Sequence, residues 1–256
     1  MFFVVSPAVA QTDFLHGLSV GVGVSAVAGI NMSLGYHNTE HESYWLRHFG
    51  MRIDFADTSA LKSALDSAID SYMRNGRNIG DGVKIDQGSL DAWHGAFLLD
   101  YYPFAGAWRL SGGYALGNST LGAAIFGEIA NASSNRYYFN LAGDHYYYNG
   151  NNFNGVATID WDYYGAYFGT GFDFRLGCGF GVFLDLGGVL TNRPARIALD
   201  IPQEQLYIYD TQSGTWSPVA IPKLESDVAR ATLEANSKLS KIRIFPMIKL
   251  GFSYNF

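Results

Sequence analysis

A strict two-residue alternation of apolar and polar side chains near the end of the chain, in "RIFPMIKLGFSYNF", is its most constraining feature. Every second residue there is apolar or aromatic: Ile242, Ile244, Pro246, Ile248, Leu250, Phe252, Tyr254 and Phe256. The positions between them include Arg243, Lys249, Gly251, Ser253 and Asn255. Because successive side chains of a β-strand point to opposite faces, this pattern predicts a strand with one apolar and one polar face.

The composition indicates that the apolar face meets lipid. Aromatic residues make up 16% of the chain and charged residues only 16%, whereas a soluble protein usually has more charge and fewer aromatics. No run of about 18 apolar residues exists, which excludes a helical span. A soluble barrel or sandwich is the competing interpretation, but its polar face would carry Lys and Glu where this chain has Gly and Ser. We therefore expect an integral protein of the bacterial outer membrane.

The alternation recurs in segments that are long enough to cross a bilayer when tilted. Residues 18–36 are about twice that length, so we expect two strands joined by a turn near 26–28. The other predicted strands are 45–55, 92–101, 108–116, 164–174, 180–190 and 242–256. The sequence thus predicts an all-β fold, a transmembrane antiparallel up-and-down β-barrel with an even number of strands. The number is eight, or ten if parts of 134–148 or 194–209 also cross.

Short links at 37–43, 103–107 and 175–179 alternate with long ones at 56–83, 117–157 and 191–241. In outer-membrane barrels the short turns are periplasmic and the long loops extracellular. Helical spacing of apolar residues predicts short helices within 58–76 and 222–239. The tyrosine-rich stretch 135–151 looks like a hairpin beyond the membrane, and its Asn149-Gly150 suits a tight turn.

The polar strand faces line the lumen on this register and carry three basic and four acidic residues: Arg52, Asp54, Asp100, Arg109, Asp173, Asp185 and Lys249. An eight-stranded barrel is just wide enough for side chains to fill it, and unpaired charges there are costly. We therefore expect salt bridges that plug the lumen. A charged translocation path, as in a small porin, is the alternative.

The first residues suggest export. The apolar start followed by Ala8-Val9-Ala10 fits the small-x-small cleavage rule of a secretory signal, although the usual basic region is missing. We expect residues 1–10 to be the remnant of a signal peptide and 11–256 to be one barrel domain, with a mature N-terminus at Gln11.

At "LLDYYPFAGAWRLSGGYALGN" the chain resembles a family of small, largely uncharacterised proteobacterial outer-membrane β-barrel proteins. The stretches "IDWDYYGAYFGTGF", "GFGVFLDLGGVL" and "FPMIKLGFSYNF" carry the same resemblance, which covers 90–118 and 156–256. It implies the fold and the location and brings no catalytic residues. Tyr254 and Phe256 are similar to the C-terminal signal that the barrel-assembly machinery reads.

Binding is the preferred function. Exposed aromatic residues beside Asn and Gly form recognition surfaces, and we expect one at Tyr146, Tyr147, Tyr148 and Phe153. Amphipathic helices in loops 56–83 and 191–241 suggest a protein partner, because their apolar stripes need burial. Lipid and lipopolysaccharide are the expected surroundings. The net charge of -6 argues against nucleic acid.

An enzyme acting on membrane lipids is the remaining alternative. His37 and His41 with Glu40 and Glu42 form a pattern that suits a metal or an ordinary polar turn. His145 follows Asp144, with Ser133 and Ser134 a dozen residues earlier. None of these spacings is diagnostic of catalysis, and nothing points to a cofactor.

Overall fold

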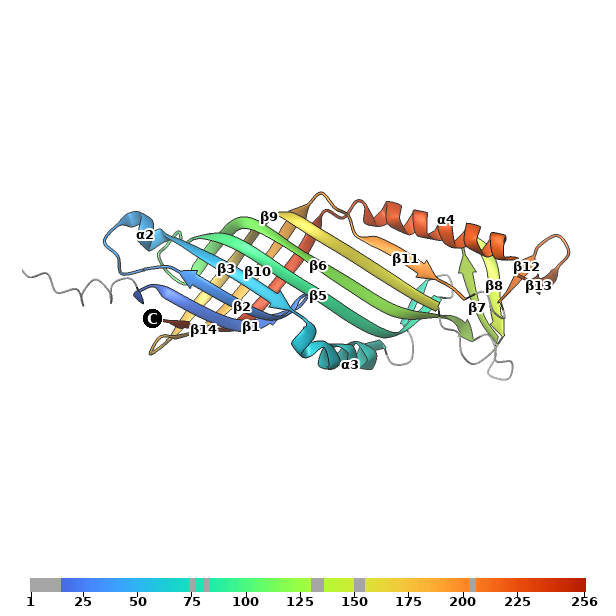
Figure 1. Cartoon of the computed structure of the whole chain (residues 1–256), viewed down its shortest axis with the longest axis horizontal. Helices are drawn as coiled ribbons and strands as arrows, with labels where there is room; N and C mark the ends of the chain where they lie inside the picture. The colour runs from blue at the N-terminus through green and yellow to red at the C-terminus, as the bar shows by residue number, and fades with distance from the viewer. Residues whose placement is uncertain (1–14, 74–76, 81–82, 130–135, 150–154, 203–205) are drawn as a thin grey trace, which may run out of the picture.

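Eight strands of the computed structural model close into one antiparallel barrel (Figure 1). The structure describes residues 15–73, 77–80, 83–129, 136–149, 155–202 and 206–256. In order round the wall, the barrel strands are β1 (Leu18–Ser25), β2 (Gly29–Tyr36), β3 (Phe49–Asp57), β5 (Val83–Tyr101), β6 (Trp108–Ile129), β9 (Gly155–Gly177), β10 (Phe180–Thr191) and β14 (Ile244–Asn255).

The last strand pairs with the first and so removes both sheet edges. Phe252 of β14 lies opposite Val22 of β1, and Gly23 lies opposite Gly251. Residues 26–28 form the tight turn between β1 and β2, as the sequence predicted. The predicted antiparallel barrel of eight strands is confirmed.

The outward side chains of the wall form an apolar band. Large apolar residues are exposed on every barrel strand; examples are Val22, Met32, Ile53, Phe97, Tyr114, Phe168, Leu186 and Phe252. Soluble monomers rarely expose a contiguous apolar surface, and one that occupies every strand of the wall marks contact with another apolar phase. The band therefore fits the hydrocarbon of a bilayer, as in other transmembrane barrels.

Three neighbouring strands continue well beyond this band. β5, β6 and β9 contain 19, 22 and 23 residues, about twice the 9–11 that a tilted membrane strand needs. Trp93 and Tyr164 are the last large aromatic side chains on the outer faces of β5 and β9. Next to them the outer wall becomes polar, where the amide of Asn118 donates hydrogen bonds to Asp160 at 2.9 Å and Asp162 at 3.2 Å.

Two short strands widen this extension. β11 (Arg196–Asp200) pairs with β9, and β4 (Arg77–Gly80) pairs with β5. The expectation that residues 117–157 form a loop was wrong at both ends of the range, because β6 continues to Ile129 and β9 already begins at Gly155. The reason is physical: outside hydrocarbon a strand needs no apolar outer face, so its alternation fades.

A second sheet lies at the far end of the extension, on the right of Figure 1. Its strands are β7 (Arg136–Leu141), β8 (Asp144–Asn149), β12 (Leu206–Asp210) and β13 (Thr215–Pro218). We call it the distal sheet. Its inner face packs with α4 (Ile221–Leu239) around a buried core made of Ile125, Phe139, Leu141, Tyr146, Tyr148, Ile201, Leu206, Val219 and Leu224.

The ten-strand alternative is wrong, because 134–148 and 194–209 contribute to the distal sheet and to β11 rather than to the membrane wall. The hairpin turn also differs from the prediction. It lies at Ala142-Gly143, with φ angles of 52° and 89°, and not at Asn149-Gly150. Asn149 ends β8, and Gly150 lies outside the described residues.

Both predicted loop helices are present. α3 (Lys62–Met73), preceded by the 3-10 turn η1 (Ser59–Leu61), lies along β5, and its Asp66 and Asp70 accept hydrogen bonds from the backbone N–H groups of Leu90 and Gly88. In the described part of the chain, no helix combines the length and hydrophobicity that a membrane span requires.

The prediction that a strand begins at residue 45 was wrong. Residues 44–48 form a short helix, α2 (Tyr44–His48), and β3 begins at Phe49. Trp45 therefore lies on this helix, 66% exposed, at the barrel end where β1 starts and β14 ends. The apolar residues of so short a helix happen to match the alternation of the following strand.

Candidate functional site

The inward face of the barrel wall brings seven charged side chains together in the lumen. We call them the lumen network: Arg52, Asp54, Asp100, Arg109, Asp173, Asp185 and Lys249. They come from β3, β5, β6, β9, β10 and β14. Each is flanked along its strand by outward-pointing residues, so the two-residue period alone directs all seven inward.

Asp185 is the centre of this network. Its two carboxylate oxygens accept hydrogen bonds from Arg52 Nη1 at 2.6 Å and from Arg109 Nη2 at 2.5 Å. Asp100 lies 3.4 Å from Arg52 Nε and accepts a 2.5 Å hydrogen bond from Ser111. Asp173 is paired with Arg109. Two guanidinium groups are thus each shared among several carboxylates.

A second ion pair joins the network from the β14 side. Lys249 Nζ donates to Asp54 Oδ2 at 2.8 Å, and both residues are only 1% exposed. Asp54 Oδ1 lies 3.6 Å from Arg52 Nε, which links this pair to the rest. All seven side chains therefore form one connected cluster across the barrel.

An apolar and aromatic layer lies on the side of the network that faces the distal sheet. Its buried members are Ala96, Leu98, Ala115, Tyr163, Tyr167, Val189, Phe245 and Met247. Tyr163 stacks on Phe245 with ring centroids 3.9 Å apart, and its hydroxyl lies 3.0 Å from Nδ1 of buried His94. These buried side chains form a second cluster in the lumen, beside the lumen network.

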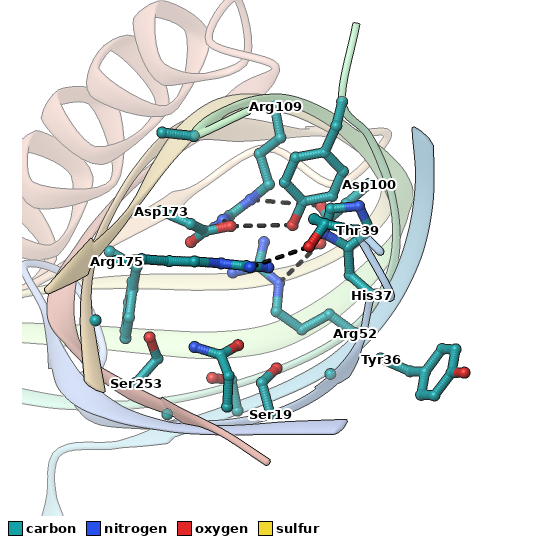
Figure 2. Close-up of a pocket in the computed structure, with 18 of the residues that line it drawn as sticks. Ser19, Tyr36, His37, Thr39, Arg52, Asp100, Arg109, Asp173, Arg175 and Ser253 are labelled. Carbon is teal, nitrogen blue, oxygen red and sulfur yellow. Dashed lines mark hydrogen bonds and ion pairs between the residues drawn. The ribbon is translucent and has the colours of Figure 1, made fainter. Parts of the chain in front are cut away.

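A cavity of about 270 Å³ opens on the other side of the network, toward the end of the barrel with the short links (Figure 2). Arg52, Asp100 and Arg109 line its charged side. Small residues such as Ser19 and Ser253 line the opposite wall. A second cavity of about 270 Å³ lies beside it.

Arg175 separates these two cavities. Its side chain extends across the barrel mouth, and Nη1 donates a 3.0 Å hydrogen bond to Thr39 Oγ1 (Figure 2). Next to it, His37 stacks on Tyr102 at 3.6 Å, and its Nε2 lies 2.9 Å from the carbonyl oxygen of Arg47. Burial and the nearby charge of Arg175 keep the pKa of His37 below its usual value, so this ring is neutral at pH 7.

Sequence reasoning considered His37 but missed Tyr102, Thr39 and Arg175 at the barrel mouth. Tyr102, whose hydroxyl donates to Asp173 at 3.0 Å, follows the last residue of β5, and Thr39 lies in a link. Outside regular strands the two-residue period carries no information. Arg175 is different, because it lies two positions after Asp173 on β9, and the same parity points it inward.

The tyrosine cluster of the distal sheet contradicts the prediction. Tyr146, Tyr147 and Tyr148 are 0%, 8% and 6% exposed, so the expectation of a surface at these three residues was wrong. Tyr146 and Tyr148 belong to the core beneath α4, and Tyr147 stacks on Tyr207 at 4.7 Å on the opposite face. Both faces of β8 are therefore covered at these three tyrosines. Phe153 lies outside the described residues.

A buried carboxylate fastens α4 to the distal sheet. Asp227 is 1% exposed, accepts a hydrogen bond from the Tyr146 hydroxyl and lies 2.8 Å from Lys223 Nζ and 2.9 Å from Arg230 Nη2. Both cations also contact Asp144, which precedes the tyrosines on β8. Burial acts to raise the pKa of Asp227, but the hydrogen bonds from Lys223 and Tyr146 hold it below the usual value.

The residues considered for catalysis are used elsewhere or fall outside the description. Asp144 pairs with Lys223, and His145 Nδ1 lies 2.5 Å from Asn140 Oδ1. Ser133 and Ser134 lie outside the described residues. Within the described segments, no three His, Cys, Asp or Glu side chains are grouped closely enough to hold a metal ion.

Closed barrel, lipid-compatible band and charged lumen together define the fold of bacterial outer-membrane β-barrel proteins. Two solved structures from Acinetobacter baumannii, CarO and CarO2, share it, each with a TM-score of 0.57 and 12% sequence identity over 94% of this chain and 99% of theirs. A major outer membrane protein from Thermus thermophilus aligns at a TM-score of 0.37 with 14% identity over 94% of this chain and 98% of that one. No protein-family model and no curated protein matches the sequence. At such low identity, the likeness to CarO shows the fold alone.

Proposed function

We propose that this protein is an integral barrel of the bacterial outer membrane, whose lumen is closed and whose distal sheet stands outside the cell. The short links then face the periplasm, as in other outer-membrane barrels. The apolar band, the barrel closure and the fold shared with CarO support this location. Surrounding lipid would include lipopolysaccharide on the outer side.

The burial of the lumen network is the main observation in favour of a closed lumen. Arg109 and Lys249, at 2% and 1% exposed, are two of the three long cationic side chains of the network, and both end on carboxylates from other strands. Opening a path would strip these charges of their partners, which costs several kcal/mol for each buried pair. The apolar layer around Tyr167 adds a second closure.

A small channel is the second candidate. The cavity beside Arg52 and Arg109 favours it, because it occupies the half of the lumen toward the short links. A path would have to cross both the network and the layer around Tyr167 and Phe245. We propose no catalytic activity, since the histidines considered for it have structural partners.

We further propose that the distal sheet takes part in surface interactions. Its outer face carries four partly exposed aromatic side chains, which lie in contact with one another or with the buried ring of Tyr147: Tyr138, Tyr207, Tyr209 and Trp216. Rigid amphipathic rings of this kind are common in recognition surfaces. The helices in loops 56–83 and 191–241 give weaker support for a protein partner than the sequence suggested, because α3 packs on β5 and α4 covers the distal core.

Assembly remains a proposal of the same kind. Tyr254 and Phe256 are 37% and 51% exposed at the end of β14, where the barrel-assembly machinery would read them. The backbone N–H of Phe256 bonds to the carbonyl of Leu18, so this segment also completes the closure of the wall.

The single cysteine of the chain gives a direct test of location and orientation. Cys178 is exposed in the turn between β9 and β10, at the end proposed to be periplasmic. A membrane-impermeant maleimide should label it only after the outer membrane of cells is permeabilised. In a Cys178→Ser background, Gln212→Cys in the exposed turn of the distal sheet should be labelled in intact cells. The reverse pattern would refute the orientation, and equal labelling in both states would refute the location.

A further inference from the structure

We propose that the first cavity described above, between the lumen network and the short links, is a binding site for a small organic monoanion, with Arg175 as its principal contact. We call it the mouth cavity. The proposal rests on the periplasmic orientation proposed above, which decides from which side a solute arrives. The proposed ligand goes beyond the proposed function, because neither the barrel fold nor the lumen network needs a bound anion.

The mouth cavity has room for such a solute because, apart from Phe183 and Asn255, the inward-facing residues of its wall on β1, β2, β10 and β14 are serines and glycines. A methyl group added at Gly35 would lie 2.9 Å from Ser19 Oγ, and one at Gly181 would lie 2.8 Å from Ser253 Oγ. Glycines at these points keep the volume near 270 Å³. This lies just below the 300–1,000 Å³ typical of small-molecule sites and suits an acid of a few carbon atoms.

The carboxylates that line the cavity are already engaged. Asp100 accepts a hydrogen bond from Ser111 and contacts both arginines of the network. Asp173 is paired with Arg109 and accepts the Tyr102 hydroxyl. A solute cation would therefore have to compete with fixed guanidinium groups for either carboxylate.

The guanidinium of Arg175, in contrast, is available to a ligand. Among the residues that the structure describes, no carboxylate lies within ion-pair distance of it, and its one side-chain hydrogen bond goes to a neutral partner, Thr39. A guanidinium has five N–H donors in a planar fork that matches a carboxylate. The bond to Thr39 fixes the side chain across the mouth and leaves further donors for a ligand.

Polar groups on the other side of the cavity complete the site. Ser19 and Ser253 point their hydroxyl groups into the same space (Figure 2), and Asn255 lines both cavities beside Arg175. A hydroxy acid such as lactate would place its carboxylate on Arg175 and its hydroxyl among these groups. The lumen network has one more carboxylate than cations, so binding is weak, with a Kd on the order of 1 mM.

The test is a titration of the refolded full chain in detergent micelles with L-lactate, followed by saturation-transfer NMR. Lactamide, which has the same shape without charge, and ethanolamine, a cation, are the comparison probes. We expect saturable lactate binding that weakens at least about tenfold in Arg175→Gln, because a charge-assisted fork is lost. Arg175→Lys keeps the charge without the planar fork, so its lactate affinity should lie between those of the parent and of Arg175→Gln. Arg193→Gln, which removes an arginine at the other end of the barrel wall, should bind as the parent does.

Three results would overturn the proposal: no saturable lactate binding, the same lactate affinity in Arg175→Gln as in the parent, or equally tight binding of lactamide or ethanolamine. Heat-modifiable gel mobility shows whether each variant folds. If Arg175→Gln does not fold, unchanged affinity in Arg175→Lys overturns the site. Stable conductance steps would refute the closed lumen but would not contradict a lactate site that depends on Arg175.

Discussion

Replacement of Lys249 by methionine tests the energetics of the lumen network. Lys249 Nζ lies 2.8 Å from Asp54, and neither residue is reached by solvent. Methionine fills a similar volume without charge, so Asp54 stays buried with only Arg52, at 3.6 Å, as an ionic partner. Breaking a buried ion pair by removing one partner costs about 3–5 kcal/mol. Because Arg52 remains, we expect a loss of about 3 kcal/mol in the free energy of unfolding.

The double variant Lys249→Met, Asp54→Leu separates this cost from loss of packing. It removes both charges, and the replacement of a buried pair by apolar residues is often neutral or stabilising. We expect it to unfold within about 1 kcal/mol of the parent. Lys238→Met is the surface control, because its pair with Glu234 on α4 is exposed and should contribute nothing measurable.

Urea unfolding of the protein in lipid vesicles, followed by tryptophan fluorescence, measures these differences. A single variant that is as stable as the parent would refute the reasoning, because it would mean that Asp54 gains water or a proton at little cost. A double variant as unstable as the single one would assign the loss to packing instead of charge.

Two further predictions concern other parts of the molecule. The pKa of Asp227 is lowered in the folded state, chiefly through Lys223 and Tyr146 against the effect of burial, so its stabilising effect is present above the unfolded pKa of about 3.9 and is lost as the pH falls through the lower folded value. Proteolysis of α4 should therefore rise below about pH 4. Asp227→Asn should make α4 sensitive already at pH 7, and resistance there would contradict the prediction. In the apolar band, Ile53→Lys should cost about 2–4 kcal/mol in the vesicle unfolding assay, while Ile53→Ala costs clearly less. Equal losses would mean that this position does not face hydrocarbon.

The sequence predicted the membrane wall well because lipid imposes the two-residue period. Phe97 and Leu99 face out and Asp100 faces in for the same reason, so the strand count, the register and the inward direction of the lumen charges all follow from parity. Arg175 follows the same parity, but the prediction ended the strand at 174 and placed Arg175 in the link 175–179, whereas β9 continues to Gly177.

The parts of the fold outside the membrane wall could not be predicted from the two-residue period. On Tyr146, Tyr147 and Tyr148 both faces are aromatic, and the sequence has no contrast that tells which side is buried. Beyond the band, outward positions such as Asn118 are polar, so a strand there looks like a loop. The positive φ of Ala142 that makes the hairpin turn has no signal in the residue type.

Single-channel conductance of the refolded protein in planar bilayers, with heat-modifiable mobility as proof of folding, tests the closed lumen most directly. We expect a folded, heat-modifiable barrel that produces no stable current steps, because any path would have to cross both the lumen network and the layer around Tyr167. Stable open steps from the folded protein would contradict a closed lumen and would identify the barrel as a small channel.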